Sequence, residues 1–236
     1  MRPVLPVTAM GRSAPVLPWV LVAICMIGLM MMLAYSFLEP ANGDAWLHFW
    51  GFVPASVIAG FEHSSGYWLN PELIGVVSAL FVHADWVHLL GNLAYLWVFG
   101  IAVERAVGHF RFALLFLVLG GLANLYVVFQ LAETSVPVVG ASGGVSAIIG
   151  IYLGLFPGRR MGLWVPLGLY LQFARVPALL VIGSWFTLQL LYSVFGPMSG
   201  AVAWWSHVAG FVAGLLTAVL LRLFSNRLHL AAKEDY

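Results

Sequence analysis

The chain has 236 residues, of which 62% are apolar and only 8% are charged. Soluble domains carry roughly 25% charged residues, so this composition excludes an ordinary soluble domain and indicates an integral membrane protein. The formal net charge of +1 gives no sign of a nucleic-acid partner, and none is expected. The single cysteine, Cys25, lies in an apolar run, cannot form an intramolecular disulfide and is interpreted as a packing residue.

Six apolar runs predict six membrane-spanning helices, because a span needs about 20 residues. In chain order the runs cover about 17–38, 86–104, 111–131, 142–157, 176–195 and 201–224. The first run is too long for the apolar core of a signal peptide, so we expect an anchor. The fourth is short, which fits a helix that begins below the membrane surface. The expected organisation is a cytoplasmic tail (1–16), a six-helix membrane domain (17–224) and a second cytoplasmic tail (225–236).

The charges predict the orientation. All ten basic residues fall on one side of the six-span topology: Arg2, Arg12, Arg105, Arg111, Arg159, Arg160, Arg175, Arg222, Arg227 and Lys233. The opposite loops contain acidic residues instead: Glu39, Asp44, Glu62, Glu72, Asp85 and Glu133. Because basic loops stay in the cytoplasm, both termini are expected there.

Two segments lie outside the predicted spans. The loop 39–85 faces outward and is rich in aromatic residues, which favours elements lying in the membrane interface over a free extracellular domain. The segment 161–174 is apolar and is interpreted as a cytoplasmic-side surface or a partly re-entrant stretch. No separate soluble domain is expected.

The first of three polar clusters is FVHADWVHLLGN, which contains His83, His88 and Asn92. Polar groups within a membrane are costly and need a reason. His88 and Asn92 are four residues apart and therefore share one face of the second span. Taken alone, this cluster is explained as well by hydrogen bonds between helices.

The second cluster surrounds Ser142, which stands among Gly140, Gly143 and Gly144. The letters GASGG fit the G-x-S-x-G pattern of soluble hydrolases, but no strand is predicted before them, so that match is coincidental. A serine in a span is usually a small packing residue. Here glycines allow neighbouring helices to approach, and the free N–H groups of a helix start suit a developing oxyanion.

The third cluster is WWSHVAGFVAG, in which His207 shares a face with the G-x-x-x-G pair Gly210 and Gly214. A histidine satisfied by a neighbouring carbonyl explains it equally well when taken alone. However, His207 lies about six residues, or ~9 Å, into the sixth span, at a depth similar to that of Ser142 and His88. Together the three clusters offer a nucleophile, a base and oxyanion donors.

A carboxylate that could complete a triad is not expected at this depth. Glu104 lies at the inner end of the second span, ~24 Å from His88 along the helix axis, and Asp85 lies in the outer loop. The expected machinery is therefore a Ser–His dyad. His83 and His88 are too few for a zinc site, and neither a metal nor a cofactor is expected.

In order and spacing these motifs resemble those of the rhomboid intramembrane serine proteases of the six-helix bacterial type. The resemblance covers about 75–215 and includes three further features: the run Gly100-x-x-x-Glu104-x-x-x-Gly108, the G-x-S-G at 140–143 and GFVPA at 51–55. It implies an all-α polytopic bundle that cleaves transmembrane segments of membrane proteins within the lipid bilayer.

The resemblance also implies residue roles. Ser142 is the implied nucleophile and His207 the general base. The side chains of His88 and Asn92, with the Ser142 backbone N–H, form the implied oxyanion hole. The implied supporting residues are His83, Gly140, Gly143, Gly210 and Gly214.

The chain departs from the family pattern at two points. Its first loop lacks the arginine of a Trp-Arg pair found in some members. Ser146 occupies a position where some members stack an aromatic ring on the base, so His207 must be oriented in another way. Trp185, Phe186 and Gln189 of the fifth span are interpreted as candidates for a substrate gate, although packing explains them equally well.

Two other functions remain open alternatives: an inactive relative that binds or routes membrane proteins, and a small transporter using the histidines and Asn92. The missing mid-membrane carboxylate counts against proton-coupled transport. Short loops and the lack of a recognisable transit sequence favour a bacterial inner membrane.

Overall fold

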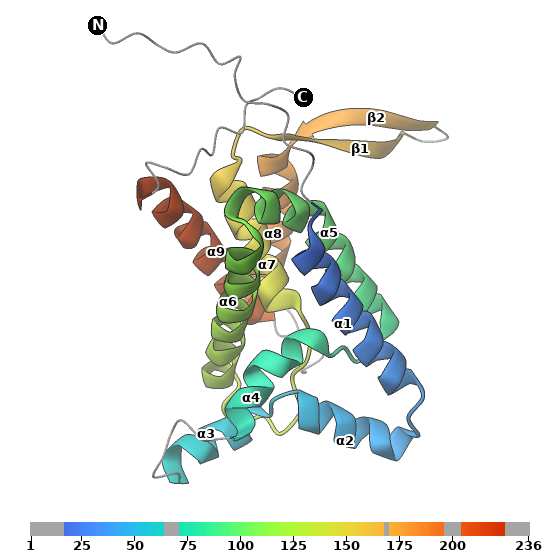
Figure 1. Cartoon of the computed structure of the whole chain (residues 1–236), viewed down its shortest axis with the longest axis vertical. Coiled ribbons are helices and arrows are strands. Elements are labelled where there is room, and N and C mark those ends of the chain that lie inside the picture. Colours follow the sequence, from blue (N-terminus) through green and yellow to red (C-terminus); the bar gives the residue numbers. More distant parts are fainter. Residues whose placement is uncertain (1–16, 64–70, 168–169, 196–203, 225–236) are drawn as a thin grey trace, which may run out of the picture.

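The computed structural model describes residues 17–63, 71–167, 170–195 and 204–224. The described chain is mostly helical. One end is formed by helices α2 (Pro40–Trp50), α3 (Pro54–His63) and α4 (Pro71–Ser78), and the other by a β-hairpin (Figure 1). We call these the loop end and the hairpin end. The tails expected at 1–16 and 225–236, and the predicted helical residues 201–203, lie outside the described residues.

Five helices in the described ranges are long and apolar enough to cross a membrane: α1 (Trp19–Ser36), α5 (Trp86–Val107), α6 (His109–Gln130), α8 (Ala178–Phe195) and α9 (Trp204–Phe224). They agree with five of the predicted spans to within a few residues. The remaining predicted span corresponds to α7 (Ser142–Leu155), which has only 14 residues. At 1.5 Å per residue it is ~21 Å long, shorter than a hydrocarbon core of ~30 Å.

Helix α7 lies at the centre of the bundle. Most of its residues are buried, on all sides of the helix, and it packs chiefly against α9, α6 and α5. A helix that is apolar all round belongs in a protein core, and the core residues Ile148, Ile149 and Ile151 are almost completely buried. The short helix is therefore enclosed by the longer ones.

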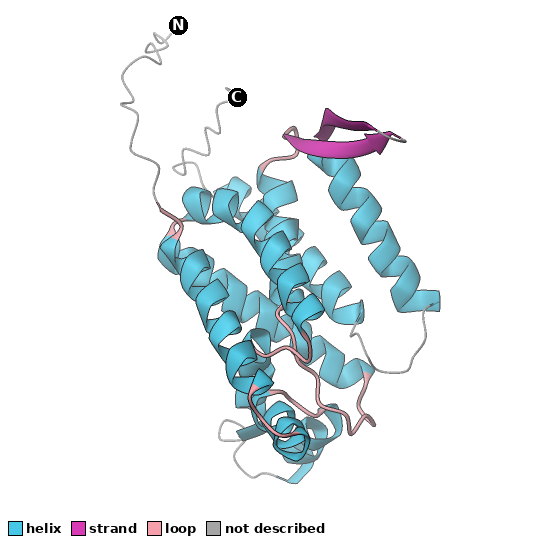
Figure 2. Cartoon of the chain, turned by 90° about the vertical axis from the view of Figure 1, so that its right-hand side faces the viewer, coloured by secondary structure: helices cyan, strands magenta, loops and turns pink. Residues whose placement is uncertain are grey.

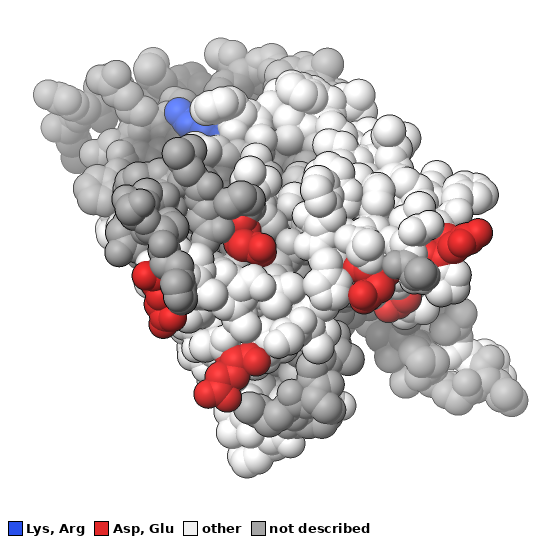
Figure 3. Space-filling model, turned by 90° about the horizontal axis from the view of Figure 1, so that it is seen from below, with Lys and Arg blue, Asp and Glu red and all other residues white. Residues whose placement is uncertain are grey.

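The described part of the loop 39–85 folds into three short helices and a turn of 3-10 helix. These are α2 (Pro40–Trp50), α3 (Pro54–His63), α4 (Pro71–Ser78) and η3 (Ala79–Phe81). Each α-helix begins with proline, whose fixed φ angle suits the first helical position. Seen from this end, acidic side chains dominate the charged groups (Figure 3).

The loop helices are fastened to the spans. Asn124 of α6 is buried and donates from Nδ2 to the carbonyl oxygen of Val76 in α4, at 2.8 Å. Phe52 and Val138 exchange two backbone hydrogen bonds, which bring the segment before α7 against the loop. The loop helices are thus bonded both to α6 and to the segment that leads into α7.

The segment after α7 corrects the expected all-α class. Strands β1 (Arg160–Leu167) and β2 (Tyr170–Pro177) pair antiparallel, from Arg160 opposite Pro177 to Leu167 opposite Tyr170. Helix α7 ends at Leu155, just before Pro157, which lacks the backbone donor that a helix interior would need, so the apolar stretch that follows does not continue α7. The hairpin extends from the bundle at the end opposite α2 to α4 (Figure 2).

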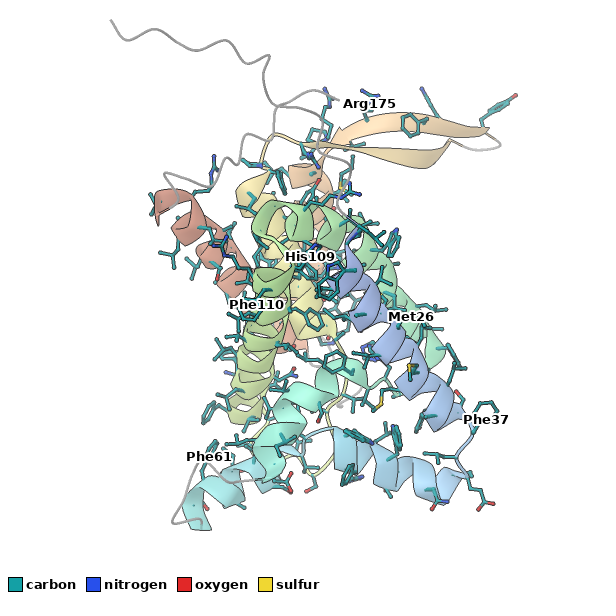
Figure 4. The ribbon with its side chains drawn as sticks, in the orientation of Figure 1. Met26, Phe37, Phe61, His109, Phe110 and Arg175 are labelled. Atoms are coloured by element: carbon teal, nitrogen blue, oxygen red, sulfur yellow. The ribbon has the colours of Figure 1, made fainter. Side chains whose placement is uncertain are left out.

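A buried carboxylate joins three helices near the hairpin end. Glu104 of α5 is 1% exposed and accepts hydrogen bonds from the backbone N–H groups of Val20 and Leu21, at 3.1 and 2.9 Å. It also pairs with the imidazole of His109 in α6, which lies beside the start of α1 (Figure 4). A negative charge is favourable beside the free N–H groups of a helix start, so Glu104 anchors α1 to the bundle.

Candidate active site

Glycines set the relative position of α7 and α9. A β-carbon on Gly210 would overlap the carbonyl oxygen of Gly143, and one on Gly214 would overlap that of Ala147. The two helix backbones are therefore in direct contact. Ser142 directly precedes Gly143, and His207 lies one turn before Gly210 toward the loop end, so this contact brings both residues to the same end of the helix pair.

His207 is held by two side chains. Its Nδ1 atom lies 3.0 Å from Oε1 of Gln189 in α8, and the ring of Trp204 meets it edge-on with centroids 5.6 Å apart. An amide oxygen only accepts hydrogen bonds, so Nδ1 carries the proton and Nε2 presents its lone pair. With 8% of its surface exposed, the imidazole is nearly enclosed.

Ser142 is the first residue of α7 and is partly exposed. The backbone N–H groups of the first helical turn have no partner within the helix and are available to an anion. Among the described residues, the hydrogen bonds do not include one between Ser142 Oγ and His207. Catalytic hydrogen bonds are often long or poorly aligned before substrate binds, so a Ser142–His207 dyad does not require this bond in the free protein.

His88 lies against the backbone that leads into Ser142. Gly140 has a φ angle of +128°, and a β-carbon there would lie 2.7 Å from Cε1 and 2.9 Å from Nε2 of His88. Only glycine allows the imidazole so near this backbone.

His83 joins α5 to the same backbone. Its Nε2 atom lies 2.9 Å from Nδ2 of Asn92 and accepts a hydrogen bond from the N–H of Ala141, at 3.3 Å. The Nδ1 atom of this buried ring therefore carries the proton, and it has no partner among the described residues. Burial lowers the pKa of His83, which lies in the loop before α5, to about 3, so the ring is neutral. One N–H of the Asn92 amide is engaged with His83 and the other stays available.

A cavity of 250 Å³ separates α8 from α5 and α7 and is lined in part by Tyr95, Ile149 and Trp185. The rings of Tyr95 and Trp185 lie 6.0 Å apart across it. Phe186 stacks on Phe211 of α9 at 4.4 Å. Of the three candidate gate residues, Trp185 thus borders the cavity, Phe186 packs on α9, and Gln189 contacts His207.

Within the described ranges, no cluster of three or more His, Cys, Asp or Glu residues could hold a metal ion. The chemistry that these residues offer is acid–base and nucleophilic. A hydroxyl lies at a helix start, an oriented imidazole lies on the neighbouring helix, and polar donors line the approach.

Residues 70–224, which include all of these side chains, match the Rhomboid domain. The chain belongs to the rhomboid family. This family includes serine intramembrane proteases.

Individual rhomboid relatives match over shorter stretches. "Putative rhomboid protease YdcA" of Bacillus subtilis is 34% identical over 124 residues, covering 50% of this chain and 60% of the relative. "Rhomboid protein 1, mitochondrial" of Saccharomyces cerevisiae is 27% identical over 154 residues, covering 61% of this chain and 40% of the relative. "Rhomboid-like protein 11, chloroplastic" of Arabidopsis thaliana is 43% identical over 81 residues, 34% of this chain and 29% of the relative. The matches thus span at most 60% of the length of these relatives.

Sequence reasoning missed the contacts of two polar side chains. Gln189 was interpreted as a gate residue, whereas its oxygen contacts His207. Glu104 was noted as part of a motif and as too distant from His88 to complete a triad, whereas its binding to the start of α1 was not foreseen. The available signal was the same for both: each is a polar or charged side chain in an apolar span, where such groups need partners.

Proposed function

We propose that this rhomboid is an intramembrane serine endopeptidase that cleaves transmembrane segments of membrane proteins. The observation that carries the proposal is the backbone contact of Gly210 with Gly143, which brings the helix bearing His207 against the start of the helix bearing Ser142. The relative named "Putative rhomboid protease YdcA" adds support from a matching region.

In the proposed reaction, Ser142 Oγ attacks the carbonyl carbon of the scissile peptide bond while His207 Nε2 takes the hydroxyl proton. The imidazolium then gives this proton to the leaving amine, and the C–N bond breaks to leave an ester on Ser142. A water molecule, deprotonated by His207, attacks the ester and releases the new carboxyl end, restoring the serine hydroxyl.

The oxyanion that forms in both steps needs donors aimed at it. The Ser142 backbone N–H is free at the start of α7, and His88 lies against the adjacent backbone at Gly140. Asn92 keeps one N–H after binding His83. These three groups are the proposed oxyanion hole. The hydrogen bond to His83 holds the Asn92 side chain in place.

The proposed substrate is a transmembrane helix that unwinds locally, because an intact helix hides its carbonyl groups in hydrogen bonds. The cavity beside Trp185 is the proposed approach, since α8 is the least buried span: 11% of its spanning window is buried, against 33% to 50% in the others. Figure 2 shows α8, which follows the hairpin, at the edge of the bundle.

We further propose that both termini and the hairpin face the cytoplasm of a bacterial cell. The described basic residues Arg159, Arg160 and Arg175 lie in or beside the hairpin, and Figure 4 shows Arg175 at that end. Acidic side chains gather at the loop end (Figure 3). Cleavage is then expected near the outer membrane face, where Ser142 begins α7.

A fluorophosphonate probe tests the proposal, because it forms a covalent bond only with an activated serine. Purified wild-type protein in detergent is expected to become labelled, whereas Ser142→Ala and His207→Ala are not. Ser146→Ala is the matched control, because this serine lies one turn further along α7 and is 1% exposed. Labelling that persists in Ser142→Ala would refute the assignment.

The inactive alternative predicts a different outcome of the same experiment. A binding or routing protein would leave the probe unreacted even in the wild type, and would retain a membrane-protein partner equally well after Ser142→Ala. Cleavage of a model transmembrane substrate in detergent, lost in Ser142→Ala, separates the two functions.

A further inference from the structure

Gln189 contacts His207, which is the general base in the proposed function, and the following proposal rests on that function. We propose that Gln189 is a positioning residue for His207, which holds the imidazole with Nδ1 protonated and Nε2 free while α8 stays packed against α9.

The behaviour of Gln189 differs from that of the other polar side chains of α8. Ser184, Thr187 and Ser193 each donate to a carbonyl oxygen within their own helix, at 2.8 to 3.0 Å. This is the usual way for hydroxyls to be satisfied in an apolar helix. The side chain of Gln189 instead reaches the neighbouring helix and presents its oxygen to His207 Nδ1 at 3.0 Å.

The surrounding rings support this contact. One turn further along α8, Tyr192 stacks on Trp204 of α9, with centroids 4.8 Å apart and planes 18° from parallel. Trp204 in turn meets His207 edge-on. The second half of α8 and the start of α9 therefore share one contact, formed by Gln189, Tyr192, Trp204 and His207. Within it the imidazole is held by a hydrogen bond and by a ring.

An amide oxygen is well suited to this role inside a bilayer. A carboxylate would orient the ring equally well, but it would bring a charge into an apolar region, where charges are costly. A neutral acceptor selects the tautomer without that charge. It also stabilises the imidazolium less than a carboxylate would, which gives the proposal a measurable signature.

Three variants test the role. Gln189→Leu keeps the size of the side chain but removes the acceptor, and is expected to lower kcat on the order of 10- to 100-fold with KM nearly unchanged, less than the full contribution of about 10²- to 10⁴-fold that a general base makes. Gln189→Glu restores an acceptor, so kcat should recover. Because a carboxylate favours the protonated imidazole, the acidic limb of the pH profile should move to higher pH. Thr187→Val is the matched control, since Thr187 bonds only within α8, and should behave as wild type.

Nitrogen-15 NMR of the histidine rings gives a readout that does not require activity. The His207 signals are assigned by their loss in His207→Ala, and the wild type should show a protonated Nδ1 and an unprotonated Nε2. In Gln189→Leu the Nδ1 signal should shift as its hydrogen bond is lost. A wild-type ring protonated on Nε2, or Gln189→Leu with unchanged signals and kcat, would overturn the proposal. The expected NMR result in a protein that never reacts with fluorophosphonate would instead refute the protease function and leave the tautomer assignment standing.

Discussion

Gly214 of α9 lies directly on Ala147 of α7, so closely that a β-carbon on Gly214 would overlap the carbonyl oxygen of Ala147. We therefore expect Gly214→Ala to push the two helices apart and to lower the free energy of unfolding by about 1–3 kcal/mol. The loss should appear although alanine favours helices by ~1 kcal/mol over glycine. Denaturant titration of the purified protein in detergent measures it.

Gly183→Ala in α8 is the control for this substitution. A β-carbon there would meet no described atom within 4 Å, so the variant should be as stable as the wild type or slightly more stable. Equal stability of Gly214→Ala and Gly183→Ala would contradict the close contact of α7 and α9.

Gly140→Ala should impair activity more than folding. The new β-carbon would require both an unfavourable backbone at φ +128° and displacement of the His88 ring, whose Cε1 atom would be 2.7 Å away. We expect a decrease in kcat of at least about tenfold, because His88 is a proposed oxyanion donor and the loss of one such donor is worth roughly 10²- to 10³-fold. Cleavage of a transmembrane substrate measures it.

The comparison variant is Gly91→Ala, next to Asn92 on α5, where a β-carbon would meet no described atom within 4 Å. Its activity should match the wild type. If Gly140→Ala also retained full kcat, His88 would not depend on the backbone at Gly140 for its position.

His83 should make the fold sensitive to acid. Burial lowers its pKa to about 3, below the value of 6.5 for an exposed histidine. Between these values the unfolded chain binds a proton that the native ring does not, so stability rises with pH over this window and falls on acidification. At pH 5 the loss from this residue is about 2 kcal/mol, at 1.36 kcal/mol per pH unit below 6.5.

His83→Gln measures this contribution, because the amide can still accept from Ala141 but does not titrate. Unfolding free energies of the variant should fall less between pH 7 and pH 5 than those of the wild type. Identical slopes in the wild type and His83→Gln would show that the ring is not held neutral by burial.

Glu104→Gln should destabilise the attachment of α1. The amide has one oxygen in place of two to accept from Val20 and Leu21, and the pair with His109 is lost. We expect the free energy of unfolding to fall by about 1–3 kcal/mol, the usual effect of leaving buried polar groups unsatisfied. Asp44→Asn, which affects only an exposed pair with His48, should have little effect, since exposed ion pairs contribute little.

The spans could be predicted because each buries or exposes a continuous apolar surface that leaves a plain signal in the sequence. The ends of α6 and α8 were predicted to within two residues, and the start of α7 was predicted at Ser142. The hairpin could not be predicted, because an apolar run of this length is compatible with a strand, a buried helix or a surface segment. The three helices of the loop were expected only as interfacial elements, since their packing depends on distant residues such as Asn124.

The candidate site could be predicted as a set of residues but not as a set of contacts. The spacing of His88 and Asn92 placed both on one helix face, yet Asn92 binds His83, nine residues away. The partner of His207 lies 18 residues away on another helix, and no local pattern indicates such a pairing. The catalytic roles assigned to Ser142, His207, His88 and Asn92 stay predictions until the labelling experiment is done.

The β-hairpin gives α8 a fixed end. β2 leads directly into α8, whose first residue, Ala178, is fully buried and donates from its backbone N–H to the carbonyl oxygen of Arg159 at 2.8 Å. A helix fixed at its first residue moves most at its far end when it tilts, and Gln189 lies in the far half of α8. Any swing of α8 that widened the cavity would therefore strain the bond to His207 early, so that admission of a substrate and readiness of the base would be mechanically linked.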